Sequence, residues 1–137
     1  KAIVKALNLI TSKSIKPLVQ RGFGVTYAAK LKKTETKIDW TEPAFAVERS
    51  IRAFSPQPGA YTSLNKTNLK IWHAGEVDIT PATSPGTVLV KEDKTLVVTC
   101  GQNALKIEEL QLSGKRRMKA RDFILGFRLI NGQIMGA

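Results

Sequence analysis

Short runs of alternating apolar and polar residues fill the middle of the chain, from about residue 60 to residue 112. Alternation with a period of two is typical of strands that bury one face, and it is clearest in residues 69–74 and 96–100. Glu109 interrupts the alternation in the last run, and we predict a bulge there. Turn-forming residues separate the runs. The pattern predicts five strands, over residues 60–64, 69–79, 87–91, 95–100 and 105–112.

Apolar residues recur at helical spacing on either side of these strands. Thr41-Glu42-Pro43 has the features of a helix start: a hydroxyl for the N-cap, an acid in the first turn and an early proline. The turn-forming residues 56–59 are expected to end this helix. A closing helix is predicted over residues 118–127. The inward positions are predicted to be Ala44, Val47, Ile51 and Phe54 in the first helix, and Phe123, Ile124 and Phe127 in the second.

The first 37 residues lack the strand pattern. Apolar residues at three- and four-residue spacing predict a short helix over residues 2–13, and Pro17 follows it. Because so short a helix is marginal in water, we expect its apolar stripe to pack on another element. The rest is expected to be irregular or extended. We therefore divide the chain into a helix at 1–16, a basic linker at 17–37 and a domain at 38–137.

Five short strands joined by tight turns predict a mainly β fold, a small OB-like β-barrel with short flanking helices. A length of 137 residues allows one domain with a real core, and the apolar fraction of 42% is ordinary for a globular protein. No apolar run reaches the roughly 18–20 residues of a membrane span. The opening segment does not resemble a signal peptide, and a chain that starts on Lys is expected to be a fragment or a processed product. A single cysteine, Cys100, fits a reducing compartment, so we expect a cytoplasmic protein.

Basic residues are concentrated at the two ends of the chain. The total of 22 Lys and Arg against 11 Asp and Glu gives a formal net charge of +11. Residues 1–37 hold nine basic residues and one acid, and residues 115–137 hold six basic residues and one acid. Residues 38–114 hold seven basic and nine acidic residues. Self-repulsion destabilises such a surface, so a neutralising polyanion is expected to bind it, and nucleic acid is the leading candidate.

The candidate contacts follow from this distribution. Residues 115–121 hold five cations in seven positions; one such run is as often a solvated surface, but two at opposite ends of a small domain favour nucleic acid. Because no exposed aromatic residue adjoins them, the cations indicate phosphate contacts, which favours duplex or folded RNA over a free single strand. The candidates from charge alone are Lys30, Lys32, Lys33, Lys37, Lys115, Arg116, Arg117, Lys119 and Arg121.

Residue types that carry catalysis are scarce. His73 is the only histidine, and no acid–base pair, metal cluster or nucleophile set can be built around it, so it is expected to be structural or on the surface. Cys100 is expected to be a buried small hydrophobe rather than a reactive thiol. The aromatic residues Trp40, Trp72, Tyr27 and Tyr61 stand beside apolar residues and are more often core than stacking surfaces. We predict no catalytic, cofactor or metal site in this chain.

Ten short motifs follow one another between residues 26 and 128. In chain order they are Tyr27-Ala28-Ala29-Lys30-Leu31, Ile38-Asp39-Trp40, the segment 49–60, Leu69-Lys70-Ile71-Trp72, Pro85-Gly86-Thr87, Cys100-Gly101, Leu110-Gln111, the segment 114–118, Asp122-Phe123 and Gly126. In order and spacing this series resembles the C-terminal domain of the methionyl-tRNA formyltransferase family. Residues 1–16 resemble the last helix of that family's catalytic domain. One departure is Arg21-Gly22-Phe23-Gly24, where many members carry a polar, often acidic segment.

The resemblance implies an OB-like barrel from a cytoplasmic enzyme that formylates the methionyl group of initiator methionyl-tRNA, with formyl-tetrahydrofolate as donor. It places the catalytic Asn, His and Asp and the folate site in an N-terminal Rossmann-like domain, so this fragment alone is expected to be inactive and to hold no cofactor. The implied partners are initiator methionyl-tRNA and that catalytic domain; we expect a monomer and no membrane. The family's positive surface falls here on Lys30, Lys33, Arg49, Arg52, Lys115, Arg116, Arg117 and Lys119.

Two other interpretations stay open from the sequence. One is the related accessory domain of a different formyl-tetrahydrofolate-dependent enzyme, of the sugar-nucleotide type, for which a less basic domain would be expected. The other is a standalone protein-interaction barrel, which an exposed apolar face and widely separated basic segments would favour.

Overall fold

The computed structural model describes residues 2–127 and 129–136, and the chain divides into two compact units, Lys1–Lys30 and Leu31–Ala137. In the first unit the regular element is helix α1 (Ala2–Thr11), close to the predicted 2–13. The Thr11 hydroxyl donates to the carbonyl oxygen of Leu7 at 2.9 Å, within the last turn. No residue from 2 to 30 is buried, and the apolar stripe of α1 is exposed.

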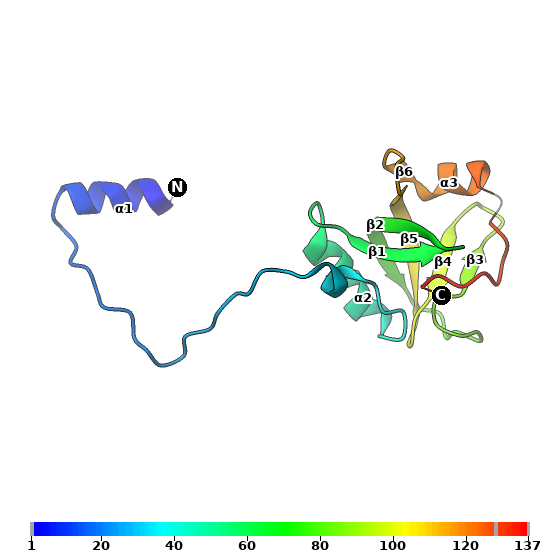
Figure 1. The fold of residues 1–137 in the computed structure, drawn as a ribbon, viewed down its shortest axis with the longest axis horizontal. Helices are drawn as coiled ribbons and strands as arrows, with labels where there is room; N and C mark the ends of the chain where they lie inside the picture. Colours follow the sequence, from blue (N-terminus) through cyan, green and yellow to red (C-terminus); the bar gives the residue numbers. More distant parts are fainter. Residues whose placement is uncertain (1, 128, 137) are drawn as a thin grey trace. The chain divides into compact units, whose positions relative to one another are not determined.

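The second unit is built on an antiparallel sheet of six strands (Figure 1). The strands are β1 (Ala60–Leu64), β2 (Thr67–Val77), β3 (Val88–Val90), β4 (Leu96–Thr99), β5 (Ala104–Leu112) and β6 (Met118–Lys119). Their order is β1-β2-β5-β4-β3, and β6 pairs with β5. The predicted mainly β class is confirmed, and each of the five predicted strands is present with bounds that differ by no more than two residues.

The six strands do not close the predicted barrel, because β1 and β3 stand at the two ends of the strand order and do not pair with each other. The C-terminal segment, residues 130–136, bridges them by backbone hydrogen bonds. The Val88 amide donates to Gln133 at 2.7 Å and the Met135 amide to Gly86 at 2.8 Å, on the β3 side. The Gly136 amide donates to Ser63 of β1 at 2.8 Å. The OB-like barrel is therefore an open sheet whose gap an irregular tail spans.

The two central strands change register on either side of the His73–Glu109 pair. Trp72 has no partner opposite it in β5, and Glu108 has none in β2. The irregularity that Glu109 predicts is confirmed. The irregularity involves both strands. The extra residue in β2, Trp72, shifts the register, and the extra residue in β5, Glu108, restores it.

Helix α2 (Ala44–Phe54) packs against β2 and buries Ala44, Val47 and Ile51, as predicted. The predicted cap at Thr41 is wrong. The Thr41 hydroxyl donates instead to the Asp39 carboxylate at 2.6 Å, and Pro43 takes the N-cap position. The first helical amide, from Ala44, donates to the carbonyl oxygen of Gln102 at 2.9 Å. A tertiary contact therefore satisfies the group that a side-chain cap would have satisfied.

Two short elements differ from the prediction. Helix α3 (Ala120–Gly126) buries Phe123 and half-buries Ile124, but Phe127 is 39% exposed and stacks on Phe123 with ring centroids 4.7 Å apart. Phe127 turns outward because the helix has ended and its backbone is extended. Near the start of the second unit, a 3-10 turn, η1 (Lys33–Thr36), replaces the irregular chain expected there.

Candidate nucleic-acid interface

Trp72 is the centre of the candidate interface. It stands at the β2 irregularity, outside the hydrophobic core cluster to which Leu69 and Ile71 belong. Two cations cover its ring: the Arg117 guanidinium carbon lies 4.0 Å from the ring centroid and Lys70 Nζ lies 5.3 Å from it. Trp72 is only 8% exposed, although it lies outside the hydrophobic core cluster. An aromatic face of this kind attracts cations, by about 0.5–1 kcal/mol for each at partly exposed sites.

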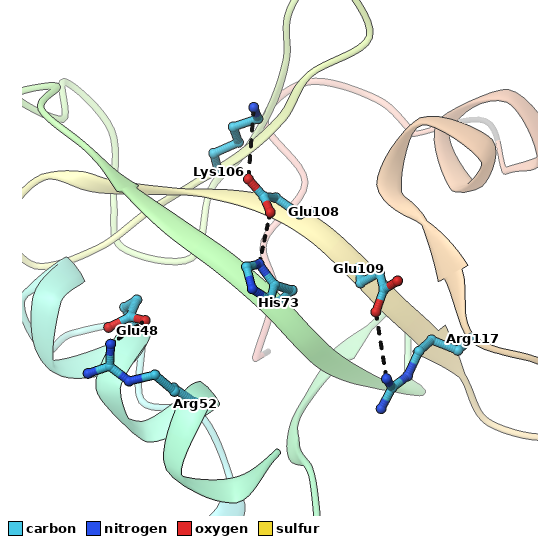
Figure 2. A network of polar contacts seen from close by, with 7 residues as sticks. All are labelled: Glu48, Arg52, His73, Lys106, Glu108, Glu109 and Arg117. Carbon is cyan, nitrogen blue, oxygen red and sulfur yellow. Dashed lines mark ion pairs between the residues drawn. The ribbon is translucent and has the colours of Figure 1, made fainter. Parts of the chain in front are cut away.

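Polar contacts tie the basic turn at residues 115–117 to the same strands. Trp72 Nε1 donates to Gln111 Oε1 at 3.1 Å, and Gln111 Nε2 donates to the carbonyl oxygen of Lys115 at 2.7 Å. Arg117 pairs with Glu109 of β5 at 3.7 Å (Figure 2). The guanidinium is therefore held between a carboxylate and an indole ring. This arrangement orders the side chain and leaves part of it exposed to solvent.

Trp72 and the residues in contact with its ring, Lys70, Gln111 and Arg117, are called the Trp72 cluster below. A groove of about 590 Å³ lies beside this cluster and brings three distant segments together. Lys33 is the first residue of η1 and Lys32 precedes it. Lys70 lies in β2, and Ser113-Gly114 form the turn that precedes Lys115. Lys70 Nζ donates to the carbonyl oxygen of Pro58 at 2.8 Å, which fixes its ammonium group at the groove. We call this feature the basic groove. Its lining also includes Leu31, Pro58, Gly59, Tyr61, Asn68 and Leu112.

Helix α2 supplies the next cation. Arg52 pairs with Glu48 at 3.4 Å (Figure 2) and lines, together with Trp72 and His73, a smaller hollow of about 210 Å³. Arg49 lies instead over the ring of Phe45 at 5.2 Å, and no described contact joins it to Trp72. Of the two arginines of α2, only Arg52 therefore lies near Trp72.

The remaining candidates are dispersed. Lys37 adjoins β1 through a backbone bridge to Tyr61, and Lys115 lines a hollow with Phe123 and Phe127. Lys119 of β6 stands opposite Glu109 of β5. Arg116 and Arg121 are exposed. Lys30 belongs to the other unit. The candidates that the structure gathers at the Trp72 cluster and the basic groove are Lys32, Lys33, Arg52 and Arg117, with the Lys115 backbone tied in through Gln111.

Most of the predicted cations are not neutralised by acids. Among residues 2–127 and 129–136, only Arg52 and Arg117 of the eleven candidates lie within 4.0 Å of a carboxylate. Lys70, which the structure places in the groove, was not among the predicted contacts. Its signal was present: Lys70 alternates with the buried Leu69 and Ile71, so it had to point away from the core.

The groups that could carry other chemistry are accounted for. His73 is on the surface, and its Nδ1 lies 2.8 Å from Glu108, which Lys106 also approaches (Figure 2). Cys100 is buried, and desolvation, with a smaller contribution from Glu76, raises the pKa of its thiol to about 12. Within the described residues no group of three or more His, Cys, Asp or Glu side chains could hold a metal ion. None of the described helices has the length and apolar character to cross a bilayer.

These features define a class: a small, mainly β domain in which cations from several chain segments gather around a tryptophan. The family can be given as well. The model of the formyl transferase C-terminal domain family matches residues 30–128, and the chain belongs to this family.

Curated relatives agree with this assignment. The methionyl-tRNA formyltransferase of Nitrosomonas eutropha is 35% identical over 133 residues, which cover 97% of this chain and 42% of the relative. Those of Aromatoleum aromaticum and Bacillus velezensis are 42% and 39% identical, over 96% and 93% of this chain and 41% and 40% of theirs. The chain thus spans about two fifths of the length of these relatives.

Solved structures extend the comparison of the fold. HypX from Aquifex aeolicus, crystallised in complex with tetrahydrofolic acid, matches with a TM-score of 0.72 and 18% identity, over 89% of this chain and 22% of HypX. A mutant form of HypX gives the same TM-score at 19% identity, over 91% of this chain and 22% of HypX. At this identity the likeness concerns the fold alone.

Proposed function

We propose that this chain is the tRNA-binding C-terminal domain of a methionyl-tRNA formyltransferase. The whole enzyme would transfer a formyl group from formyl-tetrahydrofolate to the methionyl group of initiator methionyl-tRNA, which is used in translation initiation. The relatives named above support this reading over a sugar-nucleotide enzyme. The observation that carries the binding role is the convergence of cations from four chain segments (η1, α2, β2 and the turn at 115–117) around Trp72 and the basic groove.

The proposed contacts are to RNA phosphates. Lysine and arginine that contact phosphates release condensed counterions, so they supply affinity that falls with salt and that depends little on sequence. Arg117 is suited to this role because its planar guanidinium is already oriented by Trp72 and Glu109 and loses less freedom on binding. Lys32 and Lys33, which lack carboxylate partners in the described part of the chain, would act as mobile point charges.

The remaining features of the proposal concern the parent enzyme. Residues 1–16 would pack on its N-terminal catalytic domain through the exposed apolar stripe of α1, residues 17–37 would form a basic linker, and residues 38–137 would form the domain that binds tRNA. The formyl donor and the catalytic residues would belong to the N-terminal domain. This chain alone would bind tRNA and transfer nothing. We propose a monomeric, cytoplasmic enzyme.

Filter binding of initiator tRNA to the 137-residue chain across a salt series tests the phosphate contacts. We expect the logarithm of the affinity to fall linearly with the logarithm of the salt concentration, and Arg117→Ala to reduce that slope by about one. Lys94→Ala is the matched control, because Lys94 is an exposed cation in the turn between β3 and β4 and should change the slope less. Affinity that is indifferent to salt, or equal effects of the two substitutions, would contradict the proposal.

A further inference from the structure

The basic groove combines two kinds of lining that a phosphate-binding surface alone does not need. Lys32, Lys33 and Lys70 carry its positive charge. Apolar groups share the lining, among them the ring of Tyr61. Its volume of about 590 Å³ falls within the roughly 300–1,000 Å³ of pockets that hold small ligands. A nucleotide has the same two parts, a flat apolar base and a charged phosphate.

Tyr61 is placed to receive a base. It lies in β1 opposite Lys70 of β2, it is half-buried, and it lines the groove. Its hydroxyl has no hydrogen-bond partner among the described residues. Aromatic side chains of this kind stack on unpaired bases of RNA, which a duplex keeps inside its helix.

Asn68 supplies a polar group at the same place. Its backbone oxygen accepts a hydrogen bond from the Ser113 amide at 3.0 Å, which joins the β1–β2 hairpin to the turn after β5. Its side chain is exposed and lines the groove, and in the described part of the chain its amide has no partner. An amide can donate to and accept from the edge of a base. Gln111 cannot serve in this way, because both ends of its amide are already engaged.

We infer that the basic groove binds one unpaired, unstacked nucleotide of a folded RNA. Tyr61 stacks on the base, Asn68 meets the edge of the base, and the three lysines hold the flanking phosphates. The inference rests on the proposed function, since it names the part of the RNA that this surface recognises. It also revises the expectation from sequence that the domain contacts phosphates alone.

Two RNA hairpins of equal stem length test the inference, one fully paired and one with a single bulged nucleotide, the fluorescent base 2-aminopurine. The 137-residue chain is expected to bind the bulged hairpin about tenfold more tightly, the size of effect that stacking of one base produces. The 2-aminopurine emission should fall when the base stacks on Tyr61. Equal affinities for the two hairpins, or unchanged emission on binding, would overturn the inference.

Variants assign the effect to the groove. Tyr61→Leu should abolish the preference for the bulged hairpin, whereas Tyr61→Phe should keep the preference. Tyr27→Leu is the matched control, because Tyr27 is 93% exposed and belongs to the other unit. A preference that survives Tyr61→Leu would refute the assignment. If Tyr61→Leu does not fold, as a thermal scan would show, the fluorescence of the wild-type complex decides.

The two proposals fail differently. Salt-sensitive binding of both hairpins with equal affinity would leave the proposed RNA-binding function standing and remove the nucleotide site. Absence of binding to either hairpin and to tRNA at low salt would remove both.

Discussion

At the scale of single residues, the interface depends on side chains that the core leaves free. Trp72 is itself the extra residue in β2, and Gly59 leaves room for it: a Cβ at Gly59 would lie 2.7 Å from the indole Cη2 atom. Gly59 also has φ +86°, a backbone conformation that residues with a side chain rarely adopt. The glycine, the indole and the covering cations therefore form one unit, in which a larger residue at position 59 would displace the ring that orients Arg117.

Gly101 gives a prediction on stability. A Cβ there would lie 2.8 Å from the carbonyl carbon of Thr41 and closer still to its oxygen, and backbone atoms cannot yield as a flexible side chain can. Gly101→Ala is expected to lower the free energy of unfolding by about 1–3 kcal/mol, measured by urea denaturation. Gly126→Ala is the control, because a Cβ at Gly126 meets open space, and it should change stability by less than about 1 kcal/mol. Equal effects of the two substitutions would refute the steric argument.

Cys100 gives a prediction on pH dependence. Burial raises the pKa of its thiol from 9.0 to about 12, so above pH 9.0 the unfolded chain releases a proton that the folded chain retains. The folded state then binds more protons than the unfolded state, and the free energy of unfolding must fall as the pH rises from 9.0 toward 12. Urea denaturation below and above pH 9.0 should show a steeper fall for the wild type than for Cys100→Ala. Parallel curves would mean that the thiol does not titrate differently in the two states.

At the scale of elements, the sequence predicts those features that a local pattern encodes. Five strands, α2 and the core positions of α2 follow from periodicity, and the irregularity at Glu109 follows from a break in it. Strand β6 was not predicted, because two residues are too few to show an alternating pattern. It forms only through its pairing with β5, which is a tertiary contact. The cap at Thr41 failed for a related reason, since the Gln102 carbonyl that replaces it comes from a distant turn. In the candidate interface, the charge pattern predicted Arg117 but not its contact with the ring of Trp72. That contact depends on the register between β2 and β5.

The C-terminal tail is the element whose role the sequence concealed, and it gives a stability prediction. It bridges the two sheet edges through backbone groups, and Met135, only 2% exposed, anchors it in the core. Met135→Ala should lower the free energy of unfolding by about 2–5 kcal/mol, measured by thermal or urea denaturation. The neighbouring Ile134 is exposed, so Ile134→Ala should cost less than about 1 kcal/mol. A small effect at Met135 would show that the tail is not part of the folded core.

At the scale of the whole molecule, the stabilising and the binding parts of the chain are distributed differently. The hydrophobic core cluster draws its residues from positions 38–135, and no described residue of the first unit is buried. Charge follows another division: residues 1–30 hold six basic residues and no acid, and residues 31–137 hold 16 basic and 11 acidic residues. The first unit thus contributes charge without contributing to the core.

Removal of residues 1–30 should therefore separate stability from binding. The free energy of unfolding of the remaining domain should change by less than about 0.5 kcal/mol, since no core residue is lost. Its affinity for tRNA should fall, and the salt dependence should weaken by about one unit of slope for each phosphate contact removed. The 137-residue chain with Lys13, Lys16, Arg21 and Lys30 changed to Gln should reproduce most of the binding loss, because charge and not chain length is responsible. Unchanged salt dependence in the shortened chain would show that these cations make no phosphate contacts, and a loss of stability would show that residues 1–30 belong to the folded core.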